Sequence, residues 1–264
     1  MDSHIQIPKC VLRKFTNEKQ IFHKYEINTK RISKGNPKKT GTEENFYSES
    51  MEKVLNLNLE NKLPILLSFA EEIKNTKNYI NINDEIQDIG MLYFKSLIFR
   101  NLNFHNQVKE KSVFAQFINK TYINDFCVNY GMNENLDNYF VGTKFDKKVS
   151  LENLDITFLI NYTKVPIVLP YCGMYSCDFN KKYAIFIPLN SFCCMMLLQK
   201  GEACNQFFNV EEDNIKLIEK MNKIAVNKQI NEGNGYIICC DKNYLKHKLK
   251  EMNVDINENK KVGE

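Results

Sequence analysis

Apolar positions in the first half of the chain recur at helical spacing. Between residues 50 and 73 they follow one helix face, and Pro64 within this stretch predicts a kink or a break between two helices. A further helix is predicted from Asp84 to about Arg100, because Asp84 is followed three residues later by Gln87, as in a capping box. These periods predict a helical first half.

After residue 150 the pattern changes to short apolar runs separated by Pro, Gly, Asn and Lys. Runs of this kind are typical of strands that are buried on both faces. We predict such strands at residues 156–160, 165–169, 183–187, 192–198 and 236–240. Helical spacing returns between Ile215 and Ala225, and Asp241 is predicted to cap a last short helix.

The N-terminal segment alternates apolar and basic residues, which favours strands. Residues 5–15 show this alternation after a proline, and residues 21–27 together with 31–32 predict a strand pair. Gly35, Pro37 and Gly41 then indicate a loop.

This order of elements predicts an α+β fold with a mixed or antiparallel sheet backed by several amphipathic helices. We expect a single two-lobed domain over residues 1–252, with a helical lobe at about 45–146 and a strand-rich lobe at about 150–252. A third helix is predicted within the first lobe at about 106–120. The polar tail, residues 253–264, is expected to fray.

Composition and charge bear on the location of the protein. The longest apolar run is residues 192–198, so no membrane-spanning helix and no membrane partner is predicted. Basic residues interrupt the first apolar segment, which argues against a secretory signal. The nine cysteines lack the spacing of a disulfide framework, which fits thiols kept reduced in a cytosol. We therefore predict a cytoplasmic protein.

Several short blocks resemble one uncharacterised family. Residues 5–16 (IQIPKCVLRKFT) and 21–25 (IFHKY), then Asn45-Phe46-Tyr47 and residues 94–100, are similar to the opening blocks of the bacterial family DUF4238, a domain of unknown function. Further similarities, at residues 158–169, 185–190, 222 and 236–238, extend the resemblance to about residue 241. The resemblance implies membership of the family and no specific activity.

The chain departs from the family pattern at polar positions. Ile5 stands where the family has histidine, with His4 displaced by one, and Lys164 stands near Pro166 where the family has aspartate. Pro8, Arg100 and Pro166 carry over, and both prolines are expected to be turn-formers. Arg100 either caps the C-terminus of its helix or anchors a carboxylate or phosphate.

The net charge of +4 is unevenly distributed. Residues 1–41 hold ten Lys or Arg and three Asp or Glu, which gives +7 there and leaves −3 for the rest. Lys9, Arg13, Lys14, Lys24 and Arg31 are candidates for binding the phosphates of RNA or DNA, since aromatic residues lie between them. The alternative is a set of strands whose aromatics face the core and whose lysines face water.

Catalysis, if present, would fit a divergent metal-dependent nuclease, which needs only a few acids and a lysine around a divalent metal ion. The candidate catalytic residues are His4, Arg100, Asp178 and Lys181, with no metal ligands assigned. The other interpretation is that residues 178–182 form an ordinary solvated hairpin turn.

The cysteine spacings favour buried thiols over a zinc site. Cys172 and Cys177 are four residues apart, which leaves a redox pair as an alternative, and the other pairs, Cys193-Cys194 and Cys239-Cys240, are adjacent. Adjacent residues in a strand point to opposite faces, so they cannot readily share one tetrahedral metal.

Phosphate-loop, dinucleotide-binding and hydrolase-elbow motifs are not found in the sequence. Our hypothesis is a bacterial accessory protein, of the kind used in phage defence, that binds or acts on nucleic acid. The alternative is a non-catalytic module that binds a protein partner or a small ligand.

Overall fold

A computed structural model describes residues 2–4, 7–44, 56–77, 80–100, 154–179, 182–201 and 207–257. The helix predicted at 106–120 and the candidate Lys181 lie outside these residues. None of the described helices combines the length and the apolar character that crossing a membrane requires.

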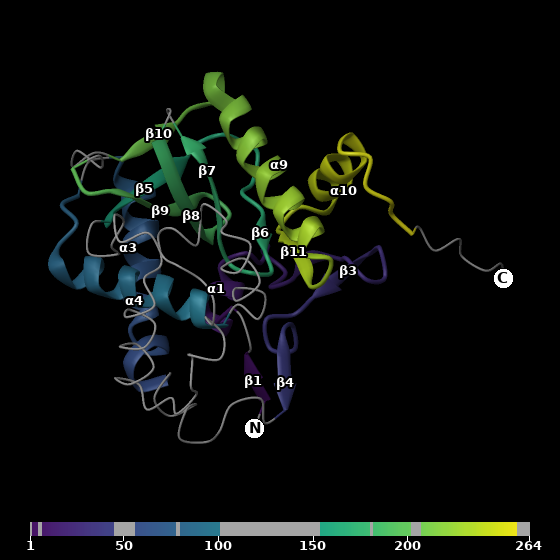
Figure 1. Cartoon of the computed structure of the whole chain (residues 1–264), viewed down its shortest axis with the longest axis horizontal. Helices are drawn as coiled ribbons and strands as arrows, with labels where there is room; N and C mark the ends of the chain where they lie inside the picture. Colours follow the sequence, from purple (N-terminus) through teal and green to yellow (C-terminus); the bar gives the residue numbers. More distant parts are fainter. Residues whose placement is uncertain are drawn as a thin grey trace, which may run out of the picture.

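One sheet has five strands and lies in the upper left of the view in Figure 1. Its strands are β5 (Leu154–Asn161), β7 (Tyr175–Phe179), β8 (Lys182–Asn190), β9 (Cys193–Gln199) and β10 (Phe208–Val210). Their order is β10-β5-β9-β8-β7, and neighbours are antiparallel except β10, which runs parallel to β5. The prediction of buried strands after residue 150 is confirmed.

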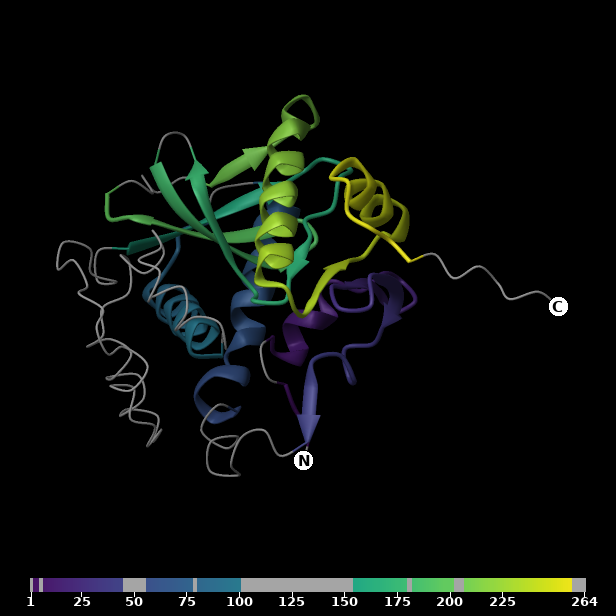
Figure 2. The ribbon, with the colours of Figure 1, turned by 45° about the vertical axis from the view of Figure 1, so that its right-hand side comes forward.

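Helices cover both faces of this sheet. One face packs against α3 (Leu63–Thr76) and α4 (Asp84–Arg100), and the other against α9 (Ile215–Glu232). Figure 2 shows α9 crossing in front of the strands, with α3 and α4 in blue below and behind. Cys193 lies in the core on the α3 side and Cys194 in the core on the α9 side, as strand alternation predicts.

A four-stranded sheet lies beside the first. It contains β2 (Phe22–Glu26), β3 (Arg31–Gly35), β6 (Leu169–Pro170) and β11 (Tyr236–Cys239) in the order β3-β2-β11-β6. The helix α10 (Lys242–Glu251) packs against β2 and β11.

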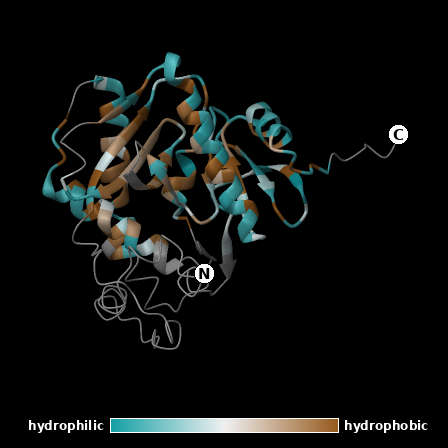
Figure 3. Cartoon of the chain, turned by 45° about the horizontal axis from the view of Figure 1, so that its top comes forward, coloured by the Kyte–Doolittle hydropathy of each residue, from teal (hydrophilic) through white to brown (hydrophobic). Residues whose placement is uncertain are grey.

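A short ladder joins β1 (Asp2–His4) to β4 (Thr42–Glu44). In Figure 3, hydrophobic residues (brown) prevail along the strands and hydrophilic ones (teal) along α10. The α+β class, with sheets backed by helices, is confirmed.

Most of the helix starts and breaks predicted from the sequence are found in the structure. A π-helical turn, η1 (Asn56–Glu60), precedes α3, and Pro64 lies in the first turn of α3, so the predicted break is confirmed. The helix α4 begins at Asp84, but the side chain that caps it belongs to Asn83, whose Oδ1 accepts a hydrogen bond from the Ile86 amide at 2.9 Å.

At the other end of the chain, the Asp241 side chain accepts hydrogen bonds from the Asn243 and Tyr244 amides at the start of α10. This confirms the cap predicted there. A 3-10 turn, η3 (Glu212–Asn214), precedes α9.

Two expectations for extended segments are wrong. Of residues 5–15, the described part, 7–15, does not form a strand: Lys9–Arg13 is a short helix, α1, and the Pro8 carbonyl accepts hydrogen bonds from the Val11 and Leu12 amides. Five residues are too few to show a helical period, so alternation was misleading there. Residues 165–169 are buried as predicted, but the ladder includes only Leu169 of this run, which pairs with β11.

The polar tail is not frayed over its described part. Residues 253–257 lie along the turn between β2 and β3. The Tyr25 hydroxyl donates to the Asp255 carbonyl at 2.8 Å, Lys30 pairs with the Asp255 carboxylate at 2.8 Å, and the Asn257 amide donates to the Lys30 carbonyl at 2.7 Å. These contacts hold residues 253–257 against the hairpin, although the polar composition of the segment predicts fraying.

Candidate anion-binding site

The candidate site is built at one end of the β2–β3 hairpin. The two strands pair with Phe22 opposite Gly35, so the segment that enters β2 lies beside the segment that leaves β3. A Cβ atom at position 35 would lie 2.0 Å from the Phe22 ring, and Phe22 is fully buried. Glycine is therefore required there for the two segments to approach.

The entering segment is held as a tight turn. The Asn17 side-chain oxygen accepts a hydrogen bond from the Lys19 amide at 3.0 Å, and the Asn17 amide donates to the Ile21 carbonyl at 2.8 Å. The Thr16 hydroxyl donates to the Arg13 carbonyl at 2.7 Å, which ties the turn to α1. Lys19 is thus fixed at its backbone while its side chain is exposed.

The segment that leaves β3 is also held as a tight turn by an asparagine. The Asn36 side-chain oxygen accepts a hydrogen bond from the Lys38 amide at 2.8 Å, and the Asn36 carbonyl accepts from the Lys39 and Thr40 amides at 3.0 Å each. Both turns therefore have the sequence Asn-x-Lys, with asparagine closing the turn and lysine exposed.

Between the two turns and the end of α1 lies a cavity of about 630 Å³. Its lining residues are Arg13, Thr16, Lys19, Gln20, Ile21, Asn36, Pro37 and Lys38. The lining contains three cations and no carboxylate. Within the described part of the chain, no ion pair engages Arg13, Lys19 or Lys38. Such a lining favours an anion that can accept hydrogen bonds.

The five basic residues that the sequence suggested for nucleic-acid binding differ in whether they line the cavity and whether a carboxylate pairs with them. Arg13 lines the cavity. Lys14 instead pairs with Glu71 of α3 at 2.7 Å, and Lys24 pairs with Glu26 within β2. A carboxylate beside each of these lysines already balances its charge, so they are weaker candidates for binding phosphate.

The other two basic candidates lie outside the lining. Lys9 is half-buried at the start of α1, and Arg31 is exposed at the start of β3. Sequence reasoning missed Lys19 and Lys38, which the hairpin brings to one cavity from the segment that enters β2 and the segment that leaves β3. The Asn-x-Lys pattern of their turns also occurs elsewhere in the chain, for example at residues 28–30 and 214–216, so it could not have identified them.

The catalytic candidates lie on separate elements. His4 is in β1 opposite Thr42, Arg100 is the last residue of α4, and Asp178 is exposed on the edge strand β7. Figure 1 places β1 at the bottom of the view and β7 in its upper half. Across the residues that the structure covers, no group of three His, Cys, Asp or Glu side chains is arranged to hold a metal ion.

The segment around Asp178 forms a hairpin. Phe179 of β7 pairs with Lys182 of β8, and Asp178 pairs with Tyr183, so both ends of this stretch lie in an antiparallel ladder. Of residues 178–182, for which the sequence allows a solvated turn, residues 180 and 181 lie outside the described part of the chain.

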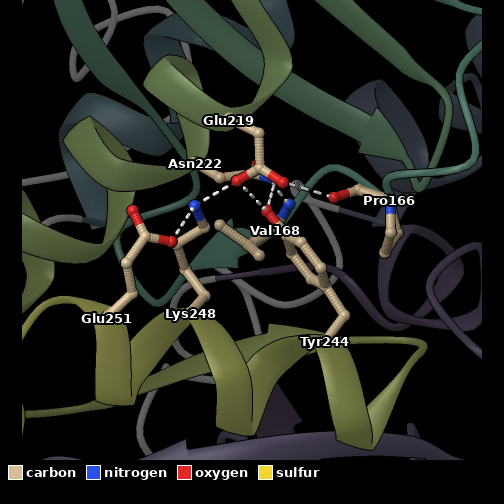
Figure 4. Close-up of polar contacts among 7 residues, drawn as sticks. All are labelled: Pro166, Val168, Glu219, Asn222, Tyr244, Lys248 and Glu251. Carbon is tan, nitrogen blue, oxygen red and sulfur yellow. Dashed lines mark hydrogen bonds and ion pairs between the residues drawn. The ribbon is translucent and has the colours of Figure 1, made fainter. Parts of the chain in front are cut away.

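A second polar cluster joins α9, α10 and the segment before β6 (Figure 4). Asn222 is fully buried: its side-chain oxygen accepts from the Val168 amide at 3.0 Å, and its Nδ2 lies 2.8 Å from both the Pro166 carbonyl and the Tyr244 hydroxyl. The Tyr244 hydroxyl donates to Glu219 at 3.1 Å. Pro166 thus takes part in the cluster through its backbone carbonyl.

The same cluster contains a buried ammonium group. Lys248 is 2% exposed and pairs with both Glu219 and Glu251, the latter at 2.9 Å (Figure 4). Burial acts to lower the pKa of Lys248, but its hydrogen bonds to the two carboxylates raise the pKa above its ordinary value. These groups partner one another, so the cluster holds helices together and leaves no open site.

Comparison with known proteins adds one match. No curated protein and no solved structure is significantly similar to the chain. A family described as "Protein of unknown function (DUF4238)" matches residues 4–147, more than half of the chain, including α1, the β2–β3 hairpin and the cavity. The similarities noted between residues 158 and 241 lie outside this match. The chain therefore belongs to the DUF4238 family.

Proposed function

We propose that the protein binds nucleic acid and that the cavity at the end of the β2–β3 hairpin contacts its phosphates. The observation that supports this is the lining: Arg13, Lys19 and Lys38 converge there without a carboxylate among the lining residues. Arginine and lysine neutralise backbone phosphates, and hydroxyl and amide side chains supply further contacts to phosphate and sugar. Thr16, Gln20 and Asn36 are of this second kind.

The size of the cavity supports a ligand larger than a single phosphate. At about 30 Å³ for each water molecule, a volume of about 630 Å³ corresponds to roughly twenty waters. The three cations come from three different segments, so they can contact successive groups of one chain. A nucleic-acid backbone carries its charges in such a series.

Equilibrium binding to labelled RNA and DNA tests this proposal. The test variant is Arg13→Glu/Lys19→Glu/Lys38→Glu, and the matched control is Lys62→Glu/Lys200→Glu/Lys216→Glu, which changes the net charge equally at scattered exposed lysines. We expect affinity to fall by about tenfold or more in the first and by about twofold or less in the control. Equal affinity of the test variant and the wild type would refute the proposal.

A small phosphorylated ligand is the second candidate. The cavity volume lies within the range of about 300–1,000 Å³ that is usual for small-molecule sites. Calorimetric titration with a mononucleotide and with a short oligonucleotide separates the two. Saturable binding of the mononucleotide, with no gain for the oligonucleotide, would favour the module that binds a small ligand.

Nuclease activity and a role in phage defence go beyond phosphate binding, and the cavity alone gives no support for either. Nuclease activity depends on Asp178 and Lys181 and on a divalent metal ion, and it stays a prediction from the sequence. Cleavage that requires Mg²⁺ or Mn²⁺ and is lost in Asp178→Ala would support it. Intact substrate with both metals in the wild type would count against it.

A further inference from the structure

Two aromatic rings and two lysines form a cluster at the C-terminal end of α3. Tyr162 directly follows β5, and Phe192 belongs to the turn between β8 and β9; both side chains are half-buried. The Asn161 amide donates to the Phe192 carbonyl at 2.8 Å, which holds the two segments together. The Tyr162 hydroxyl donates to the Lys74 carbonyl at 3.4 Å, so this ring adjoins the last turn of the helix.

An ammonium group lies over each ring. The Lys74 Nζ is 3.2 Å from the centre of the Phe192 ring, and the Lys77 Nζ is 5.3 Å from the centre of the Tyr162 ring. Neither ammonium group forms an ion pair among the residues whose positions the structure describes. Burial lowers the pKa of Lys74, because its ammonium group loses water and gains no carboxylate. Both charges are therefore left for an incoming anion to balance.

The cluster is linked to the cavity through the contact between α1 and α3. Arg13 lines the cavity, and its neighbour Lys14 pairs with Glu71 of α3 at 2.7 Å. Lys74 follows Glu71 by three residues, which is about 4.5 Å along a helix axis. Because Lys14 balances the charge of Glu71, this carboxylate repels a passing phosphate less. A strand bound in the cavity can therefore continue over the end of α3 to the rings.

We propose, on the basis that the cavity binds nucleic acid, that this cluster stacks a base of the same strand, so that the protein binds single-stranded RNA or DNA in preference to a duplex. Aromatic rings stack any base, but only a base that is not enclosed in a duplex can reach them. The Lys74 side chain is flexible, so its ammonium group moves from the Phe192 ring to a phosphate when a base takes its place. A stacked base contributes more than a cation at an exposed ring, so this exchange is favourable.

Charges around the rings determine where the phosphates lie. Burial, assisted by Glu211, raises the pKa of Tyr162, so this carboxylate lies close enough to repel an anion beside the hydroxyl. The phosphates on either side of the stacked base are therefore expected beside Lys74 and Lys77.

Equilibrium binding of the full chain to a labelled single strand and to its duplex tests the stacking. Phe192→Leu removes the ring and keeps an apolar side chain. Phe208→Leu is the matched control, since that ring is also half-buried but packs on the α9 side of the sheet. We expect single-strand affinity to fall by about fivefold or more in Phe192→Leu and by about twofold or less in the control, with duplex affinity unchanged. Equal single-strand affinity of Phe192→Leu and wild type would overturn the proposal.

The salt dependence of single-strand binding tests the two lysines. Each phosphate contact to a single strand contributes about 0.7 to the slope of log affinity against log salt concentration. We expect Lys74→Gln/Lys77→Gln to make the slope shallower by about one to one and a half, and Lys62→Gln/Lys216→Gln, at exposed positions elsewhere, to leave it unchanged. An identical slope in wild type and Lys74→Gln/Lys77→Gln would overturn the assignment of phosphates to these lysines.

Photo-crosslinking with an iodouracil-substituted single strand, followed by peptide mass spectrometry, locates the stacked base. We expect crosslinks at Phe192 or Tyr162, and crosslinks confined to the cavity lining, or none, would overturn the proposal. The outcome is distinct from that for the cavity: if Arg13→Glu/Lys19→Glu/Lys38→Glu weakens binding while Phe192→Leu does not, the stacking cluster is refuted and phosphate binding by the cavity is retained.

Discussion

Phe22 and Gly35 face each other across the β2–β3 ladder, and the Phe22 ring fills the space that any side chain at position 35 would need. The two turns that line the cavity flank this pair: one precedes Phe22 and the other follows Gly35. The pair therefore fixes how the two turns approach each other, so packing of the core and geometry of the site depend on the same contact.

Gly35→Ala tests that contact. A methyl group there would lie 2.0 Å from a ring that is fully buried and cannot move outward, so we expect a loss of about 1–3 kcal/mol in the free energy of unfolding. Lys34→Ala, at an exposed position on the same strand, should change stability by about 0.5 kcal/mol or less. Denaturant unfolding measures both, and equal stability of Gly35→Ala and wild type would contradict the contact.

Asn222 is expected to be one of the most sensitive polar positions. Asn222→Ala leaves the Val168 amide and the Pro166 carbonyl buried without their partner, so we expect a loss of about 2–4 kcal/mol. Asn227→Ala, at an exposed position on the same helix, is the control and should be nearly neutral. A small effect at Asn222 would mean that water replaces its hydrogen bonds.

The Lys248 cluster predicts a pH dependence of stability. The hydrogen bond from Lys248 lowers the pKa of Glu251 below its ordinary 4.5, so this contribution to stability is present above about pH 4.5 and is lost as the pH falls through the lowered value. The pKa of Lys248 is raised above 10.5, so its contribution is full below that pH and is lost at more alkaline pH. The cluster should stabilise the fold most between these limits.

Unfolding of Lys248→Met as a function of pH measures this contribution. The difference in stability between variant and wild type should be constant from about pH 5 to about pH 10 and should shrink on either side. Lys164→Met is the control, because Lys164 is 82% exposed and its pairing with Glu212 at 3.6 Å is expected to contribute little. A difference independent of pH would show that Lys248 contributes by packing alone.

Deletion of the tail provides a further test. Removal of residues 253–264 takes away the hydrogen bonds to Tyr25 and to the hairpin turn, so we expect a loss of about 1–3 kcal/mol and faster hydrogen exchange in β2 and β3. Removal of residues 258–264 alone should change neither. Equal stability of both truncations would contradict the docked arrangement of residues 253–257.

Much of the fold could be predicted because local signals and tertiary packing agree. Runs that are apolar at successive positions identified β5, β8 and β9, since both faces of their sheet are covered by helices. Asp241 was identified as a cap because its side chain acts on amides only two and three residues away.

The candidate site was harder to predict, because it depends on register. Arg13 was found through the local density of basic residues, but nothing in that density distinguishes Arg13 from Lys14, which pairs with Glu71 from a distant helix. Lys19 and Lys38 line one cavity because the β2–β3 register pairs Phe22 with Gly35. The docking of residues 253–257 likewise depends on a hairpin more than 200 residues earlier in the sequence.

The salt dependence of nucleic-acid binding tests the central claim most directly, because each phosphate contact contributes a fixed slope. Comparison of the wild type with Arg13→Glu/Lys19→Glu/Lys38→Glu on the same oligonucleotide isolates the contribution of the cavity. We predict that the slope of log affinity against log salt concentration becomes shallower by about two to three in the variant. An identical slope in the two proteins would contradict the assignment of phosphate binding to this cavity.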